Sequence, residues 1–519
     1  MKIIYIYSFI CMLAILSSCN GDKLEVTNPN APTAEVFWKT PKDADLGLTA
    51  VYNMFYKSGS WNRWIYFRYD LTSDEGLSNS PWTELKEWTR FTYFNYNFWE
   101  GNAWVWRDHY KAIFRANQVL FHIKDIQFTD EKQKKEIIAQ AKFLRAFYYF
   151  NLEILFENIP IVLLPSEPGD KPMQATPEQV WAQIKIDLSE AAADLPTAWP
   201  ADQTGRPTLG AAKAYLGKAN MQTGDWQAAA DAFAWLVDGE GKTLYGLVDN
   251  YKDNFKHTTE NNKESVFEIQ FSNINPNGDG DQPNQNVGSN RAQFFAPPGV
   301  GWGDGQVRRW LVDEYKKEKT VNGKIDSRLR DNIFYPEIAT DFPGEKIYGR
   351  DWNTKQWGAN CYFRKYQGDY YRNFEDYYSP INYRVIRFAD VLLCYAESLT
   401  QLASGTPPAK AIECVDRVRQ RASTNLPALE NSTLYANVIT SKSLFLKRIQ
   451  MERSLELCYE SVRWIDLKRW KLWDTQAGLD ELKSRDEDFN NFVVGKSQRL
   501  PIPQSEVDNN SNLKQNIPY

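Results

Sequence analysis

The feature that most constrains the fold is a helical spacing of apolar residues that recurs in paired segments. Thr208 can cap a first helix, Gly224 can end it, and Asp225 can cap a second helix directly after it. A comparable pair spans residues 387–418, with Gly405 between its two helices. In both pairs small side chains can face large rings, as in tetratricopeptide-type (TPR) units. The chain is therefore predicted to be mainly α-helical.

Apolar residues at spacings of three and four predict three earlier helices, over residues 106–123, 130–159 and 177–195. Counting these, the chain carries about four degenerate tetratricopeptide-like pairs, mainly within 106–237 and 385–470. Such a scaffold is predicted to be solenoid-like, because each pair buries its apolar face against its neighbours.

Two stretches, 58–104 and 272–380, depart from this spacing. The second is rich in Asn, Gly, Asp and Tyr, and the first holds many tryptophans among Ser, Asn, Gly and Pro, namely Trp61, Trp64, Trp82, Trp88, Trp99 and Trp104. Long loops in a compact protein are where binding residues collect. We predict that these two loop-rich insertions form the ligand face.

The composition favours recognition by aromatic rings over recognition by charge. The 519 residues include 19 Trp, 28 Tyr and 28 Phe, whereas the formal net charge is −5. A chain of this charge offers no basic face for nucleic acid by default. A neutral ligand is predicted, and no nucleic-acid partner.

The N-terminus has the pattern of an exported lipoprotein. Lys2 precedes an apolar run over residues 3–15, which is too short for a membrane-spanning helix, and small residues lead to Cys19. Residues 1–18 are predicted to be a signal peptide and Cys19 the lipidated residue, carrying palmitate-type acyl chains. Residues 19–35 are predicted to be a tether, and 36–519 a single domain.

No motif for catalysis or metal binding emerges. The chain has no HExxH, GxSxG or dinucleotide-binding glycine pattern. A calcium-like run from Asn273 to Gly278 lacks the glutamate required at its twelfth position, which is Asn284. Cofactors and metals are therefore not predicted. The mature chain's cysteines show no CxxC spacing and are predicted to be free, buried thiols: Cys361, Cys394, Cys414 and Cys458.

Several segments together resemble the SusD/RagB family. They are WRDHYKAIFRANQVL from Trp106, AKFLRAFYYFNLEILFENIPI from Ala141, TLGAAKAYLGKANMQTGDWQAA from Thr208, VIRFADVLLCYAESL from Val385, VDRVRQRA from Val415, ERSLELCYESVRWIDLKRW from Glu452 and LPIPQSEVDNN from Leu500. Two positions depart from the family pattern, with Glu157 where glycine is common and Phe388 where tyrosine is common.

The resemblance implies a surface-exposed outer-membrane lipoprotein of Bacteroidota. It implies a lid over a TonB-dependent, SusC-like transporter, with helical repeats against the barrel and a glycan on the loop face. It also implies that the chain has no catalytic residues and no obligatory cofactor, and is therefore not an enzyme.

Glycan binding requires flat rings against the CH face of a sugar and polar groups for its hydroxyls. Trp82, on a loop stiffened by proline, is the leading platform residue, and Trp302 lies among glycines that clear its surroundings. Asp70 is a candidate hydroxyl acceptor and Arg364 a candidate donor. These four residues are the predicted glycan-binding set.

Alternatives remain open at the level of sequence. Some relatives serve peptide transporters such as RagA-like proteins, and a glycoside hydrolase would need only two positioned carboxylates. The glycan itself is not specified: neutral plant glycans, fructans and algal polysaccharides such as ulvan all fit. The net charge of the chain is negative, but a local basic patch could outweigh it at the ligand face. Such a patch could involve Arg63, Arg68, Arg90, Arg350 or Arg364.

The charged run over 452–469 is predicted to be a structural ion-pair network.

Overall fold

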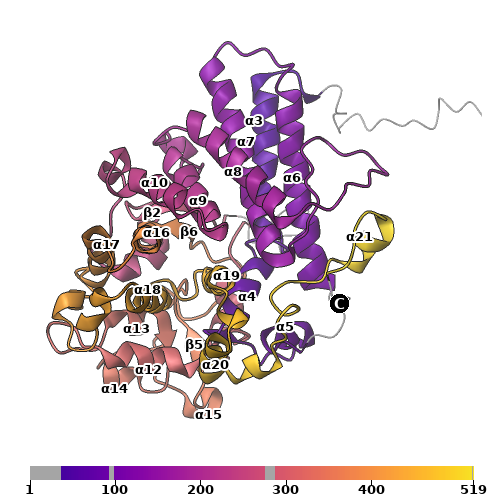
Figure 1. Cartoon of the computed structure of the whole chain (residues 1–519). Helices are drawn as coiled ribbons and strands as arrows, with labels where there is room; N and C mark the ends of the chain where they lie inside the picture. Colours follow the sequence, from indigo (N-terminus) through magenta and orange to yellow (C-terminus); the bar gives the residue numbers. More distant parts are fainter. Residues whose placement is uncertain (1–36, 93–98, 275–286, 517) are drawn as a thin grey trace, which may run out of the picture.

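The computed structural model describes residues 37–92, 99–274, 287–516 and 518–519. Four helix pairs form the scaffold, and the two helices of each pair contact one another. In Figure 1 the first two pairs lie side by side as a bundle of long helices, and the next two continue from it. The pairs are α3 (Pro41–Tyr52) with α6 (Val105–His122), α7 (Glu131–Phe156) with α8 (Pro177–Asp194), α9 (Leu209–Gln222) with α10 (Trp226–Val237), and α16 (Phe388–Leu402) with α17 (Ala409–Arg419). The predicted helical, TPR-like fold is confirmed.

The helix ends follow the capping residues of the sequence. The Thr208 hydroxyl accepts a hydrogen bond from the Ala211 amide (3.3 Å) at the start of α9, and Asp225 caps α10 in the same way. Gly224 adopts φ +73° just after α9, a conformation that glycine enters without steric cost.

Glu157 ends α7 in a backbone conformation that favours glycine, with φ +54°. Its carboxylate binds Lys468 at 2.8 Å and Arg499 at 3.0 Å, so it joins the end of α7 to the C-terminal part of the chain. Two ion pairs therefore accompany the strained backbone at this position.

The prediction that residues 58–104 form a loop is wrong for two segments, which are α4 (Trp64–Leu71) and α5 (Thr83–Thr89). Trp61, Trp64 and Trp88 are buried in the core. Every residue of α4 is buried, so its sequence carries no apolar stripe on one side, and the helical spacing used for prediction is absent.

Residues 272–380 contain short elements rather than one loop. A four-stranded antiparallel sheet has the order β1-β3-β5-β4, in which Leu77 pairs with Gln306 and so joins the two insertions. The strands are β1 (Gly76–Leu77), β3 (Gln306–Val307), β4 (Ile333–Phe334) and β5 (Cys361–Phe363), and the helices are α11 (Arg291–Phe295), α12 (Arg309–Lys317), α13 (Ser327–Asn332), α14 (Ile338–Asp341) and α15 (Thr354–Trp357). A second, bulged antiparallel pair is formed by β2 (Ser265–Ile269) and β6 (Tyr383–Arg387).

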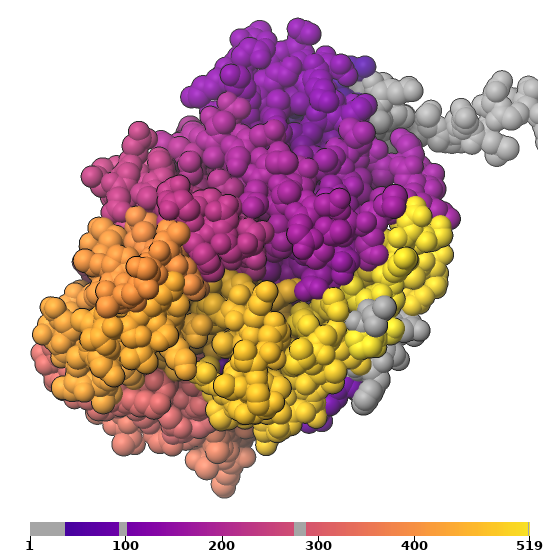
Figure 2. Space-filling view, in the orientation of Figure 1, coloured from indigo at the N-terminus to yellow at the C-terminus, as the bar shows by residue number. Residues whose placement is uncertain are grey.

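The C-terminal part packs back onto the N-terminal helices. It contains α18 (Lys442–Leu457), α19 (Arg463–Trp470), α20 (Gln476–Arg485) and α21 (Gln504–Asn509). Figure 2 shows these last residues, in yellow, lying along the edge of the N-terminal helices. The Leu500 amide donates to the Leu155 carbonyl (2.7 Å), and the Asn516 side chain donates to the Phe156 carbonyl (2.6 Å).

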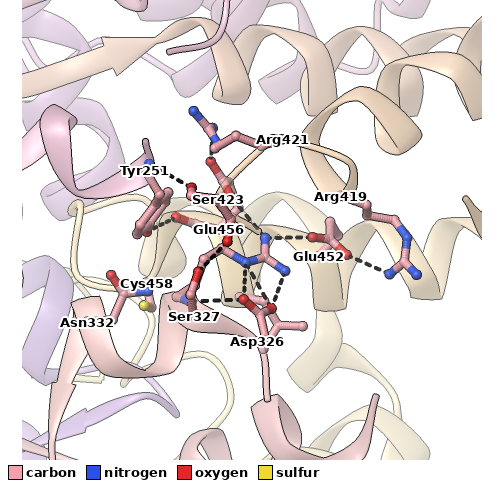
Figure 3. A network of polar contacts seen from close by, with 12 residues as sticks. Tyr251, Asp326, Ser327, Asn332, Arg419, Arg421, Ser423, Glu452, Glu456 and Cys458 are labelled. Carbon is pink, nitrogen blue, oxygen red and sulfur yellow. Dashed lines mark hydrogen bonds and ion pairs between the residues drawn. The ribbon is translucent and has the colours of Figure 1, made fainter. Parts of the chain in front are cut away.

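The predicted ion-pair network of residues 452–469 is confirmed, and it is buried. Glu452 and Glu456 of α18 both accept from Arg328, at 2.8 and 2.9 Å, and Figure 3 shows them at the centre of the network. Glu456 also binds Arg387 and Arg421, each at 2.6 Å. The network ties α18 to α13, to β6 and to the residues after α17.

The four cysteines Cys361, Cys394, Cys414 and Cys458 are free and buried, as predicted. Burial raises the pKa of each thiol to about 12. Within the described ranges, no helix is long and apolar enough to cross a membrane, and no cluster of three or more His, Cys, Asp or Glu residues is placed to hold a metal ion. Cys19 and most of the calcium-like run that begins at Asn273 lie outside the described residues.

Candidate functional site

Trp302 is the most exposed tryptophan in the described part of the ligand face, with 58% of its surface accessible. Its loop folds back on α11, because the Trp302 amide donates to the Gln293 carbonyl (2.8 Å) and the Asp304 amide to the Phe294 carbonyl (2.8 Å). A Cβ on Gly301 would lie 2.4 Å from the Gln293 carbonyl oxygen, so this close approach requires glycine. The ring is therefore exposed on a well-bonded loop.

Tyr377 fixes the orientation of this ring. The Trp302 indole nitrogen donates a hydrogen bond to the Tyr377 hydroxyl (2.9 Å). Tyr377 in turn packs edge-on against Phe294 of α11, with ring centroids 5.6 Å apart. Trp302 is thus held by side-chain as well as backbone contacts, which lowers the ordering cost of stacking a ligand on it.

Trp82 is half-buried at the start of α5. Its ring packs edge-on against Trp64 (5.0 Å) and Phe67 (6.2 Å), while the preceding Pro81 is exposed. Phe67 also packs against Phe294 (5.0 Å), the residue under Tyr377. We call Trp82, Trp302 and Tyr377 the aromatic platform. Trp82 packs on Phe67 and Tyr377 packs on Phe294, two buried rings in contact, and Trp302 is bonded to Tyr377.

Ser80 and Asp304 connect the two loops of the platform. The Ser80 hydroxyl hydrogen-bonds the Asp304 carboxyl, two residues from Trp82 and two from Trp302 respectively. Burial raises the pKa of Asp304, although the bond from Ser80 lowers it. Asp304 is 8% exposed, so this contact joins the two loops within the protein.

Asp70 does not reach this surface, and the prediction that it accepts a ligand hydroxyl is corrected. It lies within buried α4, where it pairs with Arg291 (2.7 Å) and accepts from the Ser461 amide (2.8 Å). Its side chain is 1% exposed, which leaves no oxygen for a ligand. Because Arg291 begins α11, Asp70 instead anchors the helix on which the Trp302 loop folds.

Arg364 is also corrected. It follows β5, is 6% exposed, and binds Asp369 (2.8 Å), Glu345 (3.0 Å) and the Arg330 carbonyl (2.8 Å). Its donors are engaged within the protein, so it stabilises the insertion rather than facing a ligand. Of the four predicted residues, Trp302 is exposed and Trp82 is half-buried, and their contact with a ligand remains a prediction.

No sequence signal pointed to Tyr377, Phe294 or Asp304 as parts of one site, whereas Arg63 was among the arginines considered for a local basic patch. Arg63 precedes α4, and its guanidinium lies over the Phe294 ring, 5.2 Å from the centroid. These residues come from separate stretches and meet only because α4 and α11 pack together. The one available hint for Asp304 was its place beside Trp302 in a glycine-rich run.

A separate hollow of about 260 Å³ lies between the connection of α8 to α9 and the residues around β2. Trp199, Tyr245 and Asn261 are among its lining residues. It contains none of the predicted glycan-binding residues. The platform is a surface rather than a pocket, which suits a long, flat polymer better than a small molecule.

The carboxylates next to the platform are engaged within the protein. Glu375 and Asp376 precede Tyr377, and both are bound by Arg372. Asp304 is bonded to Ser80. General acid–base hydrolysis uses two carboxyl groups on opposite sides of a glycosidic bond, and each of these three already has an internal partner.

A TPR-like helical scaffold that carries loop-borne aromatic rings defines a class of surface binding proteins, and comparisons with known proteins identify the family. One family model, described as SusD family, matches residues 263–519, and another, described as starch-binding associating with outer membrane, matches residues 25–221. The chain belongs to the SusD-like family.

Relatives and solved structures match this chain over nearly its full length. The SusD-like protein P2 of Formosa agariphila is 27% identical, with 99% of each chain covered. A SusD superfamily protein of Bacteroides vulgatus superimposes with a TM-score of 0.80 at 26% identity, covering 93% of this chain and 100% of that one. A structure described as a laminarin-binding SusD-like protein gives 0.74 at 28% identity, with the same coverage.

Proposed function

We propose that this chain is a cell-surface glycan-binding lipoprotein that captures oligosaccharide or polysaccharide and delivers it to a TonB-dependent, SusC-like transporter of the outer membrane. Its mature part would be a single domain, residues 36–519, on a short tether from lipidated Cys19. The chain would bind the glycan without cleaving it.

The observation that carries the proposal is the exposed Trp302 ring, which Tyr377 and the backbone of α11 hold in place. A preorganised aromatic surface of this kind stacks on the CH face of a sugar. A related structure is described as laminarin-binding, which supports glycans as the ligand class.

Glycan capture is tested by affinity electrophoresis of the soluble form lacking residues 1–19, in gels that contain laminarin, xylan, levan or ulvan. At least one polysaccharide should retard the protein. Trp302→Ala should weaken that retardation by about tenfold, because it removes the stacking surface. Phe121→Ala is the matched control, since Phe121 is 44% exposed on α6, outside the platform.

The alternatives predict different results from the same material. Retardation by no glycan, together with binding of peptides, would replace the proposal by peptide capture. Release of reducing ends by highly purified protein would make the chain a hydrolase. Membrane anchoring is tested separately, since Cys19→Ala should move the protein from the membrane fraction to the soluble fraction.

A further inference from the structure

We infer that the platform selects glycans that carry anionic groups, either uronate carboxylates or sulfate esters. The inference rests on the proposed function and concerns the ligand class of the same site. Its basis is a group of three arginines around the platform, Arg63, Arg90 and Arg350, that make no ion pair within the described part of the chain.

Arg63 borders the platform from the start of α4. Its guanidinium lies over Phe294, the ring that also contacts Tyr377, and it is half-buried. Its Nε is buried and has no hydrogen-bond partner in the described residues. A guanidinium over a ring in a partly desolvated position has lost part of its hydration. It therefore binds an anion more favourably than a fully solvated arginine does.

Arg350 and Arg90 border the two loops. Arg350 is exposed and donates to the carbonyls of Gly299 and Asn373, each at 3.2 Å, on the segments that lead to Trp302 and Tyr377. Arg90 donates to the side-chain carbonyl of Asn79 (2.6 Å), three residues before Trp82. Both arginines are positioned by neutral groups, so their charges are not compensated by these partners.

The nearby carboxylates pair with other groups rather than with these three arginines. Glu375 and Asp376 share Arg372, and Asp351 binds Lys346. On α5, the formal charges of the adjacent Lys86 and Glu87 offset each other, and buried Glu84 accepts from the Gly101 amide (2.9 Å). Asp304 is the remaining carboxylate between the loops, and burial raises its pKa.

Arg63, Arg90 and Arg350 are therefore not paired with these carboxylates, although the whole chain has a formal charge of −5. Guanidinium groups bind carboxylate and sulfate oxygens through paired, charge-assisted hydrogen bonds. Rings that stack on the sugar and arginines that bind its acidic substituent are the combination that an anionic polysaccharide requires.

The test compares neutral and anionic forms of the same polysaccharide backbone. Laminarin and amylose are each used in the neutral form, as the 6-carboxyl derivative and as the sulfate ester, and affinities are measured by calorimetry. At about 20 mM salt, at least one anionic form should bind about tenfold more tightly than its neutral parent. The difference should shrink at about 500 mM salt, where charges at the surface are screened. The two derivatives distinguish carboxylate from sulfate recognition.

Arg63→Gln should lower the affinity for the anionic form several-fold more than that for the neutral form, whereas Arg63→Lys should retain part of the affinity for the anionic form. Arg417→Gln is the matched control, because Arg417 of α17 also lies over a phenylalanine ring, Phe388 at 5.3 Å. Equal affinity for neutral and anionic forms, with loss of both in Trp302→Ala, would overturn this inference and keep the proposed function. Absence of binding to all of these polymers and also to xylan, levan and ulvan would overturn both.

Discussion

Replacement of Glu452 by glutamine tests whether the buried ion-pair network holds the C-terminal half together. Glu452 is fully buried on α18, and its carboxylate binds Arg328 (2.8 Å), Arg448 (2.6 Å) and Arg419 (3.4 Å). Glutamine keeps the shape of the side chain but removes its charge. Three guanidinium groups then lose one of their compensating anions in the interior.

Two independent arguments give the size of the effect. The three arginines lower the pKa of Glu452 to about 2 from its usual 4.5, despite burial, which raises it. A shift of this size corresponds to about 3 kcal/mol of stability at neutral pH. Removing one partner of a buried ion pair typically costs about 3–5 kcal/mol, which agrees. We therefore expect Glu452→Gln to lower the free energy of unfolding by about 3–5 kcal/mol at pH 7.

The pH dependence gives a sharper test. Because the folded pKa lies below the unfolded pKa, the contribution of Glu452 is complete above about pH 4.5 and is lost as the pH falls towards 2. Urea unfolding is measured at pH 7 and pH 3.5. The difference in the free energy of unfolding between variant and wild type should be smaller at the lower pH. Glu190→Gln is the control, since its 2.6 Å pair with Lys142 is half exposed and should contribute below about 1 kcal/mol. An equal loss of unfolding free energy in both variants would refute the reasoning. A difference between Glu452→Gln and wild type that stays constant with pH would refute it as well.

Three further outcomes follow from the buried groups. Asp70→Asn should lower unfolding stability by about 3–5 kcal/mol, measured in urea, because Arg291 loses its buried partner; its effect on glycan affinity should be smaller than that of Trp302→Ala. Burial lowers the pKa of His109 to about 4, so stability should rise with pH between 4 and 6.5, and His109→Gln should flatten this rise in urea titrations. A thiol reagent should modify the four buried cysteines only after denaturant is added, and rapid labelling of the native protein would contradict their burial.

The scaffold was predictable because its signals are local. Thr208, Gly224 and Asp225 mark helix ends through contacts within three or four residues, and the apolar spacing of the paired helices reports which side of each is buried. Such signals can be read from the sequence without knowledge of the tertiary structure.

The platform was predictable only in part because its geometry is non-local. Trp82 and Trp302 stood out as tryptophans among turn-forming residues, yet Trp64 and Trp88 stood out in the same way and are core residues of α4 and α5. A charged residue before a loop, such as Asp70, has the same local sequence pattern whether it faces solvent or a buried arginine. Only the packing of α4 on α11 separates these cases.

The most direct test of the central claim is a crystal structure of the protein with an oligosaccharide from the polymer that it binds most tightly. The account predicts a sugar ring stacked on Trp302, in van der Waals contact, with neighbouring units reaching Trp82 and Tyr377. A sugar bound elsewhere, for example in the hollow lined by Trp199 and Tyr245, with the Trp302 ring free, would contradict it.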